Sequence, residues 1–183
     1  MSRAPDAITA NAASRPFSAG RFCLRFLALL AVAFAAPLIA PLRHAVIEPW
    51  NRALSVATAA MLRLLGFESH ALAGSVIGPG IALEVIDACN GLDAIAVFGA
   101  ALVALGGSVR RRMMSLLIGA VTLLLLNLVR LTGLSYVAIQ HPTWLAQAHY
   151  YVGQSIMILA SVLLWIVSIR WVLPAGVNPR SRS

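Results

Sequence analysis

Residues 113–136, MMSLLIGAVTLLLLNLVRLTGLSY, decide the fold class of this chain. The stretch is almost wholly apolar, and a helix rising ~1.5 Å per residue over this length would exceed the ~30 Å hydrocarbon core of a bilayer. We therefore expect it to cross a membrane as a helix. Two strongly polar residues, Asn127 and Arg130, lie near its far end on one helix face, which favours a specific polar site there.

Three further segments resemble membrane spans, namely residues 22–42, 91–109 and 150–172. The chain is 60% hydrophobic and only 11% charged, whereas a soluble domain carries about 25% charged residues. The sequence therefore predicts an all-α integral membrane protein with about four transmembrane helices. For the first segment a cleaved signal peptide is the alternative, because Ala33-Phe34-Ala35 resembles a cleavage site.

Two segments between the first and second spans are expected to lie at the membrane surface. Residues 46–67 carry charged side chains among a helical stripe of apolar ones, and their unbroken apolar part is too short to span. This pattern predicts an interfacial amphipathic helix. Residues 74–87 contain the turn signal Gly78-Pro79-Gly80 and then alternate as in a half-buried strand. We expect a short extended or hairpin segment there, on the outer face.

The arginines predict the orientation. The net charge is +8, the chain has no lysine, and the arginines flank the apolar runs without forming a soluble basic face. Nucleic acid is therefore not an expected partner. With both termini in the cytoplasm, the positive-inside rule is satisfied. The arginines then on the cytoplasmic side are Arg3, Arg15, Arg21, Arg25, Arg110, Arg111, Arg112, Arg170, Arg180 and Arg182.

This orientation divides the chain into three parts. Residues 1–20 are expected to be a disordered cytoplasmic tail, residues 21–173 a membrane-embedded domain, and residues 174–183 a second cytoplasmic tail. The expected location is the inner membrane of the cell, with several membrane passes.

Three chemically active residues are expected at one depth. Cys89 precedes Arg110 by ~31 Å of helix, and His149 precedes Arg170 by the same ~31 Å. Arg130 follows the start of its span by ~26 Å. A thiol, a guanidinium and an imidazole from three spans therefore approach the outer face together.

These groups suit acyl transfer on a peptide. A thiol is a poor nucleophile until it ionises, a guanidinium favours the thiolate or an oxyanion, and an imidazole can move the proton. Each residue also has a plainer interpretation: Cys89 as an inert apolar residue, Arg130 as a side chain reaching the interface, and His149 as an interfacial polar group. His141, in the same loop as His149, competes with it but precedes Pro142.

Neighbouring residues are candidates for support. Asn127 shares a helix face with Arg130. Asp93, one turn beyond Cys89, either orients the arginine or histidine or stabilises its own helix N-terminus. Zinc spacing, a haem motif and a nucleotide motif are not found in the sequence, so we expect no metal and no cofactor.

The stretch Asp87-Ala88-Cys89-Asn90-Gly91-Leu92 resembles the exosortase/archaeosortase family. The resemblance continues through Asn127-Leu128-Val129-Arg130 and through His149 with Gly153, and covers roughly residues 70–160. In length the chain is similar to compact members such as exosortase H. These proteins are membrane cysteine transpeptidases that process C-terminal sorting signals.

The resemblance implies roles for the site. Cys89 would be the nucleophile, Arg130 would stabilise the thiolate or oxyanion, and His149 would be the acid and base, with Asn127, Asp93 and Gly91 in support. The substrates would be exported proteins with a C-terminal motif, a transmembrane helix and a basic tail. Two alternatives stay open: a protease that only hydrolyses, and a non-catalytic subunit of a surface polysaccharide or protein export system.

Overall fold

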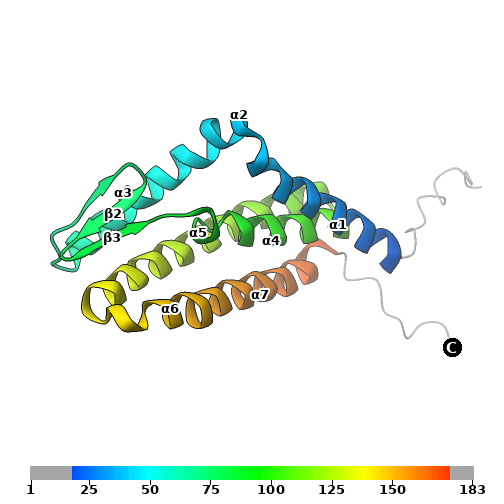
Figure 1. The fold of residues 1–183 in the computed structure, drawn as a ribbon. Helices are drawn as coiled ribbons and strands as arrows, with labels where there is room; N and C mark the ends of the chain where they lie inside the picture. The colour runs from blue at the N-terminus through cyan, green and yellow to red at the C-terminus, as the bar shows by residue number, and fades with distance from the viewer. Residues whose placement is uncertain (1–17, 174–183) are drawn as a thin grey trace, which may run out of the picture.

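The computed structural model describes residues 18–173. The tails expected at 1–20 and 174–183 lie outside this range, apart from Ser18 and the first residues of α1, which begins at Ala19. Figure 1 shows long helices lying side by side, with a small sheet at one end. The main helices are α1 (Ala19–Ala35), α3 (Glu48–Leu64), α4 (Leu92–Leu105), α5 (Val109–Gln140) and α7 (Gln154–Val172).

Within residues 18–173, three helical segments are long and apolar enough to cross a membrane. They are Ala19–Leu38, Val109–Gln140 and Pro142–Val172. The last includes a 3-10 turn (Pro142–Trp144), α6 (Leu145–Gln147) and a π-helical turn (Ala148–Gly153) that leads directly into α7. This confirms the predicted class, an all-α integral membrane protein.

The fourth apolar helix, α4, is shorter than the span expected at 91–109. Its 14 residues rise only ~21 Å, less than the ~30 Å hydrocarbon core. It ends where Gly106 (φ +80°) and Gly107 (φ +87°) turn the chain, a conformation that glycine adopts without steric cost. α4 contacts α1, α5 and α7, and these longer helices surround it.

α4 packs closely on α5 because one helix contributes an aromatic ring and the other a glycine. A Cβ at Gly119 of α5 would collide with the ring of Phe98, and Phe98 is only 1% exposed. The other buried side chains of this cluster are Leu102, Leu123, Met157 and Val172. This packing fixes the position of α4 along the length of α5, and hence the position of the turn that precedes α4.

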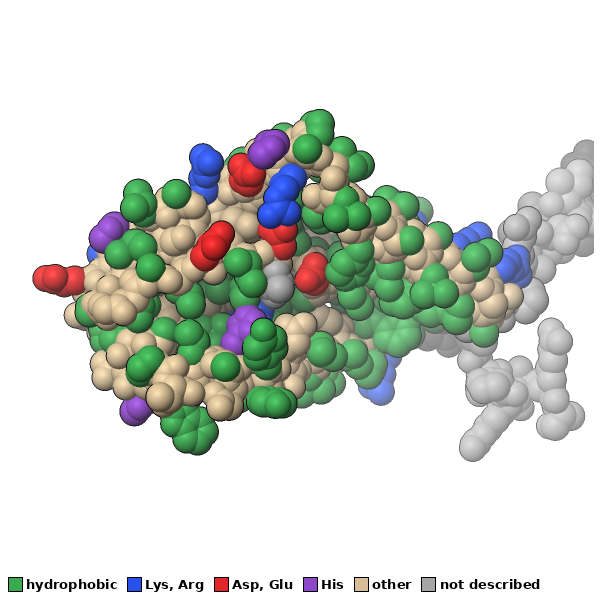
Figure 2. Space-filling model, viewed as in Figure 1, with side chains coloured by type: hydrophobic (Ala, Val, Ile, Leu, Met, Phe, Trp, Pro, Cys, Tyr) green, Lys and Arg blue, Asp and Glu red, His purple; other side chains and the backbone are tan. Residues whose placement is uncertain are grey.

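The outward faces of these helices are apolar. Large side chains such as Leu117 (67% exposed) and Val167 (67%) point away from the bundle, and Figure 2 shows hydrophobic side chains along the helices on the visible face. Monomeric soluble proteins rarely expose so much contiguous apolar surface, so lipid is the natural solvent here. Most of the acidic side chains visible in Figure 2 lie over the half that holds α3 and the sheet.

The helix expected within residues 46–67 is present as α3, and the expected extended segment is a three-stranded antiparallel sheet. The order is β1 (His70–Leu72), β2 (Ser75–Gly78), β3 (Ile81–Glu84). Gly78-Pro79-Gly80 makes the β2–β3 turn as predicted, but β1 was not expected, because three residues are too few to show an alternating pattern. Apolar residues of α3, the sheet, the segment that follows the sheet and α5 share one core: Leu54, Ala59, Leu62, Val76, Val85, Cys89 and Leu131.

Candidate active site

The thiol of Cys89 sits in a tight turn between the sheet and α4. Residues Asp87–Cys89 form a 3-10 turn, and Gly91 follows in the left-handed region (φ +77°) as the residue before the helix. Asn90, 2% exposed, accepts a hydrogen bond on Oδ1 from the main-chain N–H of Leu92 at 3.0 Å. The turn thus places Cys89 just before α4, at the end of that helix opposite Arg110.

α3 holds this turn from one side through hydrogen bonds. Trp50 donates from Nε1 to the carbonyl oxygen of Asn90 at 3.1 Å, and Asn90 donates from Nδ2 to Oδ1 of Asn51 at 3.1 Å. Asn51 in turn donates to Oδ1 of Asp87 at 3.2 Å. Arg43 pairs with the other oxygen of Asp87 at 2.7 Å. These residues fix the main chain on both sides of Cys89.

α5 holds the turn from the other side through Asn127, which is fully buried. Asn127 donates from Nδ2 to the carbonyl oxygen of Cys89 at 3.0 Å. Gly91 makes this approach possible, since a Cβ there would lie 2.9 Å from Cγ of Asn127. Asn127 also accepts from Nη1 of Arg130 at 3.4 Å. One amide therefore joins the cysteine turn to the arginine.

His149 reaches Cys89 from the π-helical turn before α7. Its Nδ1 lies 3.6 Å from Sγ of Cys89 and its Nε2 lies 3.7 Å from the same atom. A hydrogen bond directed along the lone pair of one ring nitrogen would place the other nitrogen clearly farther away. The near-equal distances mean that a rotation of the imidazole is needed to align one nitrogen with the thiol, as is common in sites without substrate.

Arg130 brings a buried positive charge to the same place. Arg130 is 9% exposed, and its Nε and Nη2 atoms are buried without a hydrogen-bond partner among the described residues. Within residues 18–173, no carboxylate pairs with it. A Cβ at Gly153 would lie 2.7 Å from Nε, so the missing side chain at Gly153 gives the guanidinium its room. A buried cation with unused donors is suited to an anion or to a developing oxyanion.

The thiol is not strongly activated at rest. Burial raises the pKa of Cys89, and the nearby charge of Arg130 lowers it, the burial effect being the larger. Because burial disfavours the charged form of a thiol, Cys89 is mainly protonated near neutral pH. A neighbouring base is therefore needed to make it nucleophilic, and His149 is the one in contact.

A cavity of about 360 Å³ opens beside the cysteine and histidine. Cys89 and His149 contribute the reactive atoms to its wall. The remaining lining is mostly apolar and comes from β3 and its continuation, from α5 and from the Pro142–Tyr150 segment: Leu83, Glu84, Ile86, Leu131, Leu134, Pro142, Leu145, Ala146 and Tyr150. A peptide with apolar side chains could therefore reach the thiol.

Comparison with known proteins gives one match. Residues 14–166 match the family described as transmembrane exosortase (Exosortase_EpsH). The chain belongs to the transmembrane exosortase family. No curated protein and no solved structure matches it.

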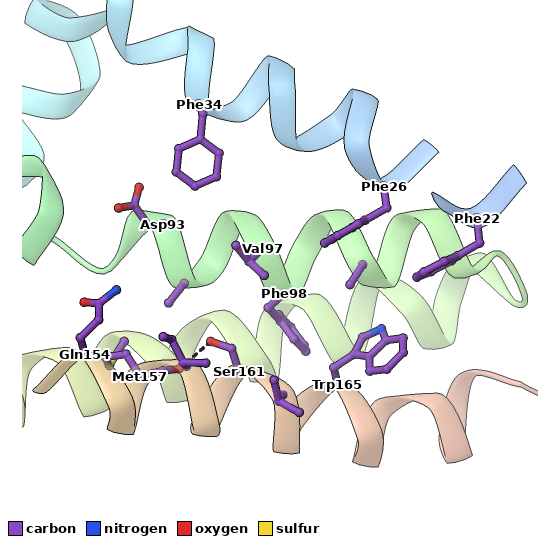
Figure 3. A pocket seen from close by; sticks show the side chains of 14 residues that line it. Phe22, Phe26, Phe34, Asp93, Val97, Phe98, Gln154, Met157, Ser161 and Trp165 are labelled. Atoms are coloured by element: carbon purple, nitrogen blue, oxygen red, sulfur yellow. Dashed lines mark hydrogen bonds between the residues drawn. The ribbon is translucent and has the colours of Figure 1, made fainter. Parts of the chain in front are cut away.

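The structure places this exosortase's predicted site residues in two groups. Cys89, His149, Arg130, Asn127 and Gly91 lie together around the turn described above. Asp93 lies apart and makes no hydrogen bond with Arg130 or His149 within the described residues. It faces a different cavity, of about 500 Å³, between α1, α4 and α7. Figure 3 shows it with Gln154 at one end of that cavity and with Phe22 and Trp165 at the other.

His141, the competing histidine, is exposed and does not line the exosortase cavity that holds Cys89. Sequence reasoning missed Trp50, Asn51 and Asn90. Asn90 adjoins Cys89, so an unexplained asparagine beside a candidate nucleophile was a usable signal. Trp50 and Asn51 are about forty positions away along the chain, and only the packing of α3 shows their contact with the turn. Within residues 18–173, no cluster of His, Cys, Asp or Glu could hold a metal ion.

Proposed function

We propose that this exosortase is a membrane cysteine transpeptidase or protease that cleaves the C-terminal sorting signals of exported proteins. The observation that carries the proposal is the 3.6 Å contact between Sγ of Cys89 and Nδ1 of His149, on the wall of an apolar cavity. The buried guanidinium of Arg130 and the family membership support it.

The proposed reaction begins when His149 takes the thiol proton and Sγ of Cys89 attacks a substrate carbonyl carbon. The S–C bond forms, and the former carbonyl oxygen becomes an oxyanion. Arg130 stabilises this charge with its unpaired N–H donors. The C–N bond then breaks, His149 gives its proton to the leaving amine, and the C-terminal transmembrane segment departs with a new amino terminus.

The acyl-enzyme left on Cys89 is a thioester. An amine acceptor turns the reaction into transpeptidation, and water turns it into hydrolysis. Neither step requires a metal or a nucleotide. The substrates we propose are exported proteins that end in a short motif, an apolar helix and an arginine-rich tail.

The proposed location is the inner membrane, with both termini cytoplasmic and Cys89 facing the periplasm. The supporting observation is that Cys89 precedes α4 while Arg110, Arg111 and Arg112 follow it at the start of α5, so that the thiol and the arginine cluster lie at opposite ends of one helix. A membrane-impermeant thiol reagent added outside intact cells should then label Cys89 and leave Cys23 unlabelled. Labelling of Cys23 alone would mean that the orientation in the membrane is the opposite of the one proposed.

The function is tested with a reporter expressed together with the enzyme. The reporter joins a secreted, tagged domain to the C-terminal segment of a protein from the same genome that ends in a motif, an apolar helix and an arginine-rich tail. The wild type and the control variant Cys23→Ser should shorten the reporter. Cys89→Ala and Cys89→Ser should not. The mass of the product separates transfer from hydrolysis.

Cleavage by Cys89→Ala at the wild-type rate would contradict the proposal. That result would favour a non-catalytic subunit of an export system, whose function does not depend on the thiol.

A further inference from the structure

One edge of the small sheet is unpaired and lies next to the cysteine. The strand order puts β3 at the edge, with β2 on its other side. Val85 donates its main-chain N–H to the carbonyl of Gly74 at 3.1 Å. Since paired residues alternate along an antiparallel ladder, Leu83 also bonds to β2, while Ala82 and Glu84 turn their N–H and C=O groups to the free side. Within residues 18–173, their main chains make no hydrogen bond outside the sheet.

This free edge faces the cavity that contains the thiol. Leu83, Glu84 and Ile86 line the cavity, and no residue of β2 does, so the cavity lies beyond β3 on the unpaired side. Figure 1 shows β3 as the strand of the sheet nearest α6, whose residues form part of the opposite wall. The chain that leaves β3 runs directly into the turn that carries Cys89.

An extended peptide bound in the cavity beside Cys89 needs partners for its main-chain N–H and C=O groups. The cavity wall is mostly apolar, from Leu131, Leu134 and Leu145 among others, and backbone groups left unpaired in apolar surroundings cost several kcal/mol each. The free edge of β3 offers two donors and two acceptors. An added strand would use them, and its alternate side chains would enter the cavity.

Building on the proposed function, we infer that the free edge of β3 binds the recognition motif of the substrate polypeptide as a fourth strand. β3 has four residues, so the bound segment is about four residues long at ~3.3 Å per residue. The side chain that points into the cavity is apolar. The residue at the end of the bound segment nearest the cysteine turn presents its carbonyl carbon to Sγ of Cys89.

Proline substitution tests the main-chain contact. Ala82→Pro removes the donor on the free edge, where proline is otherwise tolerated. The comparison variant Ala82→Val keeps this donor. Ala71→Pro is the matched control, because Ala71 lies on β1 at the opposite edge, away from the cavity. With the reporter described above, Ala82→Pro should raise KM about tenfold, the effect of losing about one good hydrogen bond, with little change in kcat. Ala82→Val should bind the reporter more tightly than Ala82→Pro.

Two further measurements keep the outcome clear. Alkylation of Cys89 by iodoacetamide at the wild-type rate shows that the site of Ala82→Pro is folded. A benzophenone amino acid at position 82, in a Cys89→Ala background, should cross-link to the reporter at alternate residues of one short segment.

A wild-type KM for Ala82→Pro, or cross-links to lipid only, would overturn the inference. If Cys89→Ala is inactive in the same assay, the proposed function survives that result. If Cys89→Ala still cleaves the reporter, the proposed function itself is wrong.

Discussion

Asn127 donates a hydrogen bond from Nδ2 to the main-chain oxygen of Cys89 at 3.0 Å, and accepts one from Nη1 of Arg130 at 3.4 Å. A single amide on α5 therefore sets the position of the main chain at Cys89 and the position of the buried cation. Within residues 18–173 it forms no hydrogen bond with the thiol and does not line the cavity, so we regard it as a positioning residue. Its amide is suited to this task because it offers a donor and an acceptor at once.

Replacing Asn127 by Leu should lower activity and stability together. The carbonyl of Cys89 loses its donor and Arg130 loses its acceptor, and an unsatisfied buried group costs about 1–3 kcal/mol. We expect a lower Tm in detergent. We also expect a cleavage rate at least about tenfold below wild type, because the cysteine turn and the guanidinium are no longer held in place. Thr132→Ala on the same helix is the control, because among the described residues the Thr132 hydroxyl bonds only to the carbonyl of Leu128. Equal losses in both variants would count against a special role for Asn127.

Replacing His149 by Gln should remove proton transfer while keeping a polar side chain. The cleavage rate should fall about 10²- to 10⁴-fold, the usual contribution of a general acid or base, with a smaller change in KM. His141→Gln is the matched control and should keep the wild-type rate, because His141 is exposed and lies outside the cavity. The measurement is the reporter assay. A larger loss of cleavage rate in His141→Gln than in His149→Gln would identify His141 as the base instead.

Replacing Gly153 by Ala should displace Arg130. A Cβ would lie 2.7 Å from Nε of that side chain, closer than atoms approach without movement, so the guanidinium must shift. We expect a clear loss of kcat, since a small displacement of an oxyanion donor can cost about 10²-fold. Gly133→Ala is the control, because no described atom outside its own helix turn lies within 4 Å of a Cβ there. Normal kcat in Gly153→Ala would show that the present position of Arg130 is not required.

The pH dependence of thiol alkylation should show whether burial or the charge of Arg130 has the larger effect on the pKa of Cys89. Burial raises the pKa of this thiol and Arg130 lowers it, and only the thiolate reacts with iodoacetamide. In a Cys23→Ser background, the rate should therefore be low near neutral pH and rise through a midpoint above the ordinary pKa of a thiol.

The variant Arg130→Gln then tests the sign of the charge effect. Without the positive charge the thiolate is less favoured, so the midpoint should move to higher pH. A midpoint that moves to lower pH would mean that Arg130 does not favour the thiolate.

Much of the fold could be read from the sequence, because membrane segments are defined locally. Composition and length identify residues 113–136 as a span without reference to any other segment. α4 is the exception. Its shortness follows from the turn at Gly106 and Gly107 and from packing against the three longer helices, and the apolar sequence through 91–109 does not reveal either.

For the site, the sequence could predict depth but not contact. Counting residues from the arginines places Cys89, Arg130 and His149 near the same end of their helices, because the rise of a helix is constant. It does not tell which faces of the helices meet. Nor does it reveal that Gly91 and Gly153 leave room for Asn127 and Arg130.

The sequence alone determined that this protein lies in a lipid membrane and roughly where its helices begin and end. It also predicted which candidate site residues lie at the same depth in that membrane. Only the tertiary structure decided that Sγ of Cys89 meets the ring of His149, that α3 holds the cysteine turn through Trp50 and Asn51, and that the free edge of β3 faces the cavity. The physical reason is that hydropathy and helical rise are properties of neighbouring residues. Contacts between side chains forty to sixty positions apart depend on how each helix is rotated, and packing sets that rotation.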